Sequence, residues 1–138
     1  MNQRRWVVAY WTLFVVFLGT GILNMLHVRG GFLTNHTADL VAPAWLYVAS
    51  RGLHSAHAPR TLVQRTLGRT PERAAIGLFL ASTLTEICQF YWPRGVFSGR
   101  YDVLDILAYA VGLASCYIAD KRSILAVRDA TGGRDATA

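Results

Sequence analysis

Apolar residues in this chain fall into four long runs, separated by short polar segments. We predict four helices, over residues 6–26, 38–53, 74–92 and 102–119. A helix of about 20 apolar residues crosses the roughly 30 Å hydrocarbon core of a bilayer. The second run is the shortest and carries Pro43 near its start, so both a crossing helix and a half-embedded one remain open. The predicted fold is an all-α integral membrane bundle of four transmembrane helices.

The segments between these runs set the boundaries of the bundle. Pro71 and Glu72 suit the start of the third helix, because proline is tolerated in a first helical turn. Residues 51–73 form either an amphipathic helix on anionic lipid or a solvated loop. Residues 1–122 then form one membrane domain, and residues 123–138, polar and Gly-containing, a cytoplasmic tail predicted to be disordered.

Composition agrees with a membrane protein. Hydrophobic residues make up 53% of the 138 positions and charged residues 16%, against about 25% charged in soluble domains. The net charge of +6 does not indicate a nucleic-acid partner, because the basic residues lie between apolar runs. The two cysteines, Cys88 and Cys116, fall within apolar runs, and we interpret them as packing residues.

The basic residues predict the orientation of the chain. With the N-terminus inside, eleven of the fourteen Lys and Arg residues are cytoplasmic, and the outer side keeps Arg29, Arg94 and Arg100. This distribution follows the positive-inside rule. We therefore expect a multi-pass protein of the inner (plasma) membrane with both termini in the cytoplasm.

The third run contains a carboxylate, Glu86, followed three residues later by Gln89. A charge at bilayer depth costs about 3 kcal/mol on insertion scales, so Glu86 needs a partner or a proton. At 1.5 Å per residue it lies roughly 18 Å along its helix, in the outer half of the membrane. In this topology Asp39, Asp102 and Asp105 fall at the same outer level.

The fourth run has a polar face of its own. Asp102, Asp105, Tyr109 and Gly112 follow one another at intervals of three or four residues, which places them on one side of a helix. Gly112 would let another helix approach closely. We expect this face and that of Glu86 to be turned toward each other, with Arg100 or Arg94 neutralising the carboxylates.

The stretch "TEICQFYWPRGVFSGRYDVLDILAYAVG" resembles the VanZ-like family of small bacterial membrane proteins. The resemblance covers about a third of the chain, roughly positions 74–119. It depends on Glu-x-x-Gln on one span, an Arg in the outer loop, and an Asp followed by a Gly on the next span. These are Glu86 and Gln89, Arg100 or Arg94, Asp105 and Gly112 in this sequence. The family usually has Asn four residues after the Asp, where this chain has Tyr109, as in related uncharacterised membrane families.

The resemblance implies a role in the cell envelope, and three hypotheses remain open for the outer polar residues. They bind a lipid-linked or anionic envelope component, they act in catalysis with Glu86 as general acid or base, or they are a structural clasp in a subunit of a membrane complex. No nucleophile with a paired base is evident, so we lean away from an enzyme. We expect no cofactor and no metal, and interpret His36 as a loop residue without a partner.

Overall fold

The computed structural model describes residues 3–26, 31–56, 61–92 and 101–132, and these are helical in all their long segments. Five α-helices and one short 3-10 helix lie in the described ranges. Their bounds are Gln3–Met25 (α1), Phe32–Ser50 (α2), Leu62–Thr66 (α3), Leu67–Arg69 (η1), Pro71–Tyr91 (α4) and Val103–Gly132 (α5).

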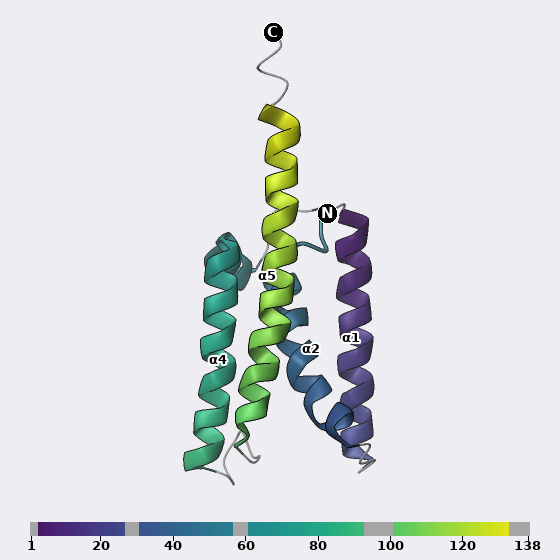
Figure 1. Cartoon of the computed structure of the whole chain (residues 1–138), viewed down its shortest axis with the longest axis vertical. Coiled ribbons are helices and arrows are strands. Elements are labelled where there is room, and N and C mark those ends of the chain that lie inside the picture. Colours follow the sequence, from purple (N-terminus) through teal and green to yellow (C-terminus); the bar gives the residue numbers. More distant parts are fainter. Residues whose placement is uncertain (1–2, 27–30, 57–60, 93–100, 133–138) are drawn as a thin grey trace.

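The four long helices run alternately up and down in an antiparallel bundle (Figure 1). The start of α1, the end of α2 and the start of α4 lie at one end, which we call the basic end. The end of α4 and the start of α5 lie at the other, which we call the acidic end. Among the described elements α2 packs against α1, α4 and α5, whereas α1 contacts α2 alone.

Three of the helices are long and apolar enough to cross a membrane, namely α1, α4 and α5. They indicate a multi-pass membrane protein. The α2 helix does not meet this criterion, although we predicted a fourth span there. The physical reason for its lower hydropathy is its central position in the bundle. Because α2 packs against other helices, it can bury Ser50 and place His36 and Asp39 in contact with α5. It also begins at Phe32, six residues earlier than predicted.

An aromatic contact attaches α1 to the rest of the bundle. The rings of Tyr10, Phe14 and Phe17 lie one helical turn apart and all pack against Trp45 of α2, with centroids 5.4 to 6.0 Å away. Tyr10 also stacks on His54 at 4.2 Å. Most other large apolar side chains of α1 are exposed, as expected for a helix that faces lipid on its other sides.

The last helix is longer than predicted. We expected a disordered tail from residue 123, but α5 continues to Gly132 and rises beyond the bundle (Figure 1). This prediction is wrong for residues 123–132, because the Lys, Arg, Ile, Leu and Ala that follow Asp120 favour a helix and no breaker occurs before Gly132. Residues 133–138 lie outside the described part.

The predicted basic segment after α2 contains a short helix rather than a long amphipathic one. Thr61 and Gln64 form a capping box at the start of α3, where the Thr61 Oγ1 accepts from the Gln64 amide at 3.2 Å. Gly68 of η1 packs on the main chain of Ser50, where a Cβ would overlap the Ser50 carbonyl. Thr70 then caps α4 and Pro71 opens it, as predicted for this boundary.

Candidate functional site

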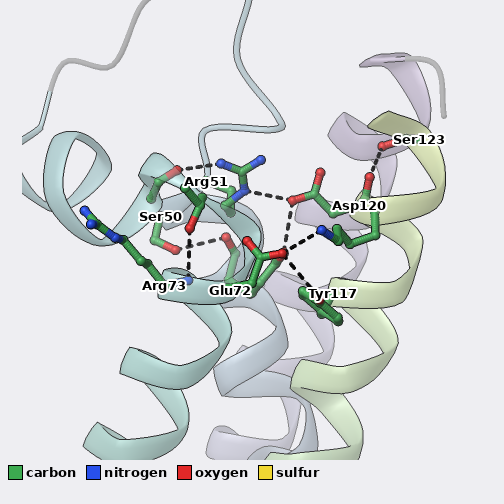
Figure 2. A network of polar contacts seen from close by, with 11 residues as sticks. Ser50, Arg51, Glu72, Arg73, Tyr117, Asp120 and Ser123 are labelled. Atoms are coloured by element: carbon green, nitrogen blue, oxygen red, sulfur yellow. Dashed lines mark hydrogen bonds and ion pairs between the residues drawn. The ribbon is translucent and has the colours of Figure 1, made fainter. Parts of the chain in front are cut away.

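Two groups of polar side chains lie at opposite ends of the bundle. The first, at the basic end, we call the paired network (Figure 2). Its centre is the ion pair between Arg51 Nε and Asp120 Oδ2 at 2.7 Å, with Asp120 only 1% exposed. The Tyr47 hydroxyl donates to the same carboxylate at 3.0 Å, and a second Arg51 nitrogen donates to the Gly68 carbonyl at 2.6 Å.

A more exposed pair lies beside this centre. Lys121 Nζ contacts Glu72 Oε1 at 2.6 Å, and the Tyr117 hydroxyl donates to the same oxygen at 3.4 Å. Each carboxylate of the paired network therefore has its own cation and additional donors. Burial of charge is tolerated when it is paired and hydrogen-bonded in this way. The paired network joins α2, α4 and α5, and we interpret it as a structural clasp.

The second group, which we call the acidic cluster, lies at the acidic end and comprises Asp39, Glu86, Asp102, Asp105, Tyr109 and His36. Glu86 of α4 is its most buried member, at 1% exposed. The Tyr109 hydroxyl of α5 donates to Glu86 Oε1 at 2.7 Å, and the Asp102 amide donates to Oε2 at 3.3 Å. The sequence-predicted residues Glu86, Asp102 and Tyr109 are thus in direct contact.

Hydrogen-bond acceptors outnumber donors in the acidic cluster. The Tyr109 oxygen is also 3.4 Å from Asp39 Oδ1, but a phenol has one proton and donates to one acceptor at a time. Asp39 further interacts with the carboxyls of Asp105 and Glu86. Within the described ranges these four carboxyls form no ion pair with Lys or Arg. Carboxyls thus outnumber basic side chains in the described acidic cluster, in contrast to the paired network.

His36 is the one basic side chain among the described residues of the acidic cluster. Its Nδ1 lies 2.6 Å from Asp105 Oδ1, and both side chains are about 15% exposed. We interpreted His36 as a loop residue without a partner, and this was wrong. The reason is that α2 begins at Phe32, which places His36 one turn before Asp39 and on the side of α2 that faces α5.

Gly112 allows α5 to approach α2 closely. A Cβ at this position would overlap the carbonyl oxygen of Leu40 and lie 3.6 Å from the Cβ of Ala44. We expected the polar face of α5 to turn toward α4. It is shared instead, because Tyr109 lies between Glu86 of α4 and Asp39 of α2, and Asp105 meets His36.

One predicted site residue, Gln89, does not join the cluster, and two more lie outside the described part of the chain. Gln89 is half-buried on α4, and no hydrogen bond from it to the cluster is found among the described residues. Arg94 and Arg100, the alternatives for the neutralising arginine, lie outside the described residues.

One trio in the cluster has the donor types of a metal site. One ligand atom from each of His36, Asp102 and Asp105 lies within 4.8 Å of the others. However, Asp102 Oδ1 accepts from the Leu104 amide at 2.9 Å, and His36 and Asp105 bind one another. Three donors are also one fewer than the four ligands that structural zinc sites use. The trio alone therefore falls short of a metal site, and we assign no metal ion to it.

Sequence reasoning missed the paired network. Arg51 was counted only among the cytoplasmic basic residues, and Tyr47 and Asp120 were assigned no role. A signal was available on α5, where Asp105, Tyr109, Gly112, Cys116 and Asp120 recur every three or four residues and extend one polar and small face along the helix. No such pattern links Arg51 to Asp120, whose contact depends on how α2 crosses α5.

No family model, no curated protein and no solved structure matches this chain.

Proposed function

We propose that this chain is a small multi-pass membrane protein that binds a polar component of the cell envelope at the acidic cluster. The observation that carries the proposal is the buried carboxyl of Glu86, which is surrounded by further carboxyls and lacks a Lys or Arg partner in the described structure. Ionisable groups inside a membrane bundle are costly and therefore commonly mark a binding site or a pathway.

Membrane insertion is supported by the surface of the long helices. Large apolar side chains are exposed all along α1, α4 and α5, including Val15 at 63%, Leu80 at 61% and Val111 at 56%. An apolar surface of this extent is unfavourable in water and suits contact with lipid tails. The first, third and fourth predicted spans correspond to these three helices.

The proposal includes α2 as a fourth transmembrane helix and an orientation of the bundle in the membrane. The α2 helix crosses the membrane in the centre of the bundle, where α1, α4 and α5 cover its polar side chains. The basic end carries Arg51, Arg65, Arg69, Arg73 and Lys121 and lies in the cytoplasm by the positive-inside rule. The acidic cluster then lies near the outer face of the membrane.

The contrast between the two polar groups favours a site over a clasp at the acidic end. In a structural clasp each charged side chain has a partner of opposite charge within the protein, as Asp120 has Arg51 in the paired network. The acidic cluster has more acceptors than donors, so a ligand with donors would complete it. The described cluster residues include no serine, threonine, cysteine or lysine paired with a base, and we propose binding rather than catalysis.

The kinship that best fits this proposal is with VanZ-like proteins. It depends on Glu86, Gln89, Asp105 and Gly112, with Tyr109 in place of the usual Asn. The position of Tyr109 supports the interpretation that the replacement of Asn by Tyr matters for function. The Tyr109 hydroxyl lies between Glu86 and Asp39, and the shorter side chain of Asn would not extend to both carboxyls.

The test uses cells in which the gene is deleted and then complemented with the wild type or with Glu86→Gln. The carboxamide keeps the size of the side chain and an acceptor for Tyr109, but removes the charge. We expect normal accumulation in the membrane fraction together with the sensitivity profile of the deletion strain toward cell-wall-directed antibiotics. Accumulation is measured by immunoblot of an epitope-tagged chain.

The matched control is Leu84→Ala, on the same helix at a side chain that is 58% exposed. It should leave both accumulation and sensitivity unchanged. If Glu86→Gln reduces accumulation in proportion to the change in sensitivity, the cluster is a clasp and the binding proposal is wrong. A Glu86→Gln strain that matches the wild type in both readouts would equally contradict the proposal.

A further inference from the structure

A groove between α2 and α5 opens directly beside the acidic cluster. It encloses about 340 Å³ and is lined by His36, Thr37 and Leu40 of α2 and by Leu104, Leu107, Ala108 and Val111 of α5. The four residues of α5 recur at intervals of three, one and three positions, so they share one face of the helix. This face lies next to the face of Asp105, Tyr109 and Gly112 that builds the cluster.

The geometry of the two helices explains why a hollow forms there. The α2 and α5 helices are in closest contact where Gly112 meets the Leu40 carbonyl. From that contact they diverge toward the acidic end (Figure 1). Leu40 and Val111 line the groove near this contact. His36 lies about one helical turn from Leu40, and Leu104 about two turns from Val111, both nearer the end of the bundle.

The groove is polar at one end and apolar along the rest. His36 and Thr37 lie at its mouth, and His36 is bound to Asp105 at 2.6 Å. The remaining lining is aliphatic. A hollow with this polarity suits an amphiphile whose headgroup lies at the end of the bundle and whose chain follows the helices into the membrane. Its volume is at the lower end of the roughly 300–1,000 Å³ of ligand pockets, which suits one acyl chain better than two.

The charge at the mouth selects the headgroup. Asp102 and Asp105 each have a carboxylate oxygen within 4.8 Å of a ring nitrogen of His36, which lines the groove, and Asp39 and Glu86 belong to the same cluster. Within the described ranges His36 is the one basic side chain bound to any of these carboxyls. An anionic headgroup would be repelled by these carboxyls. An ammonium group carries positive charge and three hydrogen-bond donors, and it would supply the donors that the acidic cluster lacks.

We propose that the groove between α2 and α5 holds one acyl chain of an outer-leaflet lipid with a primary ammonium headgroup, and that the ammonium binds Asp105 and Asp102. The inference deepens the proposed function, on which it rests, by naming the class of envelope component. Phosphatidylethanolamine is the simplest lipid with this chemistry and serves as the probe.

The experiment measures lipid retained by the purified full chain. The protein is reconstituted from detergent in the presence of equal amounts of phosphatidylethanolamine and phosphatidylglycerol with matched acyl chains, and bound lipid is counted by native mass spectrometry. We expect one phosphatidylethanolamine per chain, retained in preference to phosphatidylglycerol. Asp105→Asn should weaken retention about tenfold, because it removes one charge-assisted hydrogen bond. Its control, Asp129→Asn, changes an exposed carboxyl on the same helix and should have no effect.

A second pair of variants tests the groove itself. Ala108→Phe places a ring in the groove and should abolish retention, whereas Ala114→Phe puts the same ring on an exposed position of α5 outside the groove and should not. Thermal unfolding in detergent identifies any variant that does not fold. Should Ala108→Phe misfold, the same comparison is made with Leu107→Ala, which widens the groove and should shorten lipid residence.

Equal loss in Ala108→Phe and Ala114→Phe, no retained lipid, or preferred retention of phosphatidylglycerol would overturn the inference. These results leave the broader proposal intact if Glu86→Gln cells still accumulate the chain and lose the envelope phenotype. If that phenotype is also unaffected by Glu86→Gln, both proposals fail.

Discussion

Two carboxyls in this bundle, Glu86 and Asp120, are each 1% exposed, yet their surroundings differ in kind. Asp120 has the guanidinium of Arg51 and the hydroxyl of Tyr47. Glu86 has a phenol and one main-chain amide at 3.3 Å. A buried carboxyl that is paired with a cation needs no further partner. A buried carboxyl that lies next to other carboxyls is stabilised by a ligand that brings hydrogen-bond donors.

The hydroxyl of Tyr109 should therefore matter to stability. Tyr109→Phe removes the 2.7 Å hydrogen bond to Glu86 and leaves that buried carboxyl with the Asp102 amide alone. We expect the free energy of unfolding in mixed micelles to fall by about 1–2 kcal/mol. The control is Tyr117→Phe, which removes a 3.4 Å bond to the half-exposed Glu72 and should change stability by much less. Equal losses in the two variants would contradict the structure at Glu86.

The paired network allows a comparison of two ion pairs formed by consecutive residues of α5, Asp120 and Lys121. Asp120→Ala leaves the guanidinium of Arg51 without a carboxylate partner in a nearly buried position and should cost roughly 3–5 kcal/mol. Glu72→Ala breaks a pair whose side chains are 44% and 45% exposed and screened by solvent, and should cost much less than Asp120→Ala. Both are measured by denaturation in the same micelles. A larger loss for Glu72→Ala would show that the centre of the network is misidentified.

The sequence allowed part of the acidic cluster to be predicted. Spacing of three and four residues placed Asp105, Tyr109 and Gly112 on one face, and the antiparallel topology put Asp39 and Glu86 at the same level. The contact of His36 with Asp105 could not be predicted, because it depends on where α2 begins. The Arg51–Asp120 pair could not either, since 69 residues separate its members and only the crossing of α2 and α5 joins them.

At the scale of the helix, Gly112 sets the distance between α2 and α5. Gly112→Ala puts a Cβ against the Leu40 carbonyl, which belongs to the main chain and cannot rotate away, so the helices must separate. We expect a loss of roughly 1–3 kcal/mol on unfolding in micelles. Gly21→Ala in α1 is the control, because no atom lies within 4 Å of its Cβ and alanine favours helix. A stabilising effect of Gly112→Ala would refute the close approach.

Hydropathy predicted the helices that face lipid and was least informative for the helix that does not. The α1, α4 and α5 helices were recognised because lipid contact requires apolar side chains along most of their length. The start of α2 was placed too late, since its first turns carry Thr, Asn and His. The end of α5 was placed too early, because a helix that leaves the membrane continues on helix propensity after the apolar run ends.

At the scale of the molecule, the two ends of the bundle differ in charge and in how far their charged side chains are paired. The basic end is joined by ion pairs across α2, α4 and α5. The acidic end combines carboxyls with an apolar groove. In the proposed four-pass orientation, this division suits a protein anchored by ion pairs at its basic end and open to envelope lipid at its acidic end.

The sidedness of the two ends tests this account most directly. Single cysteines are introduced by Ala56→Cys after α2 and by Trp92→Cys after α4, in a chain carrying Cys88→Ser and Cys116→Ala. Intact spheroplasts are treated with a membrane-impermeant maleimide, before and after lysis. We expect Trp92→Cys to be labelled in intact spheroplasts and Ala56→Cys only after lysis. Labelling of Ala56→Cys in intact spheroplasts would contradict the fourth pass or the orientation, and with it an acidic cluster open to the outer leaflet.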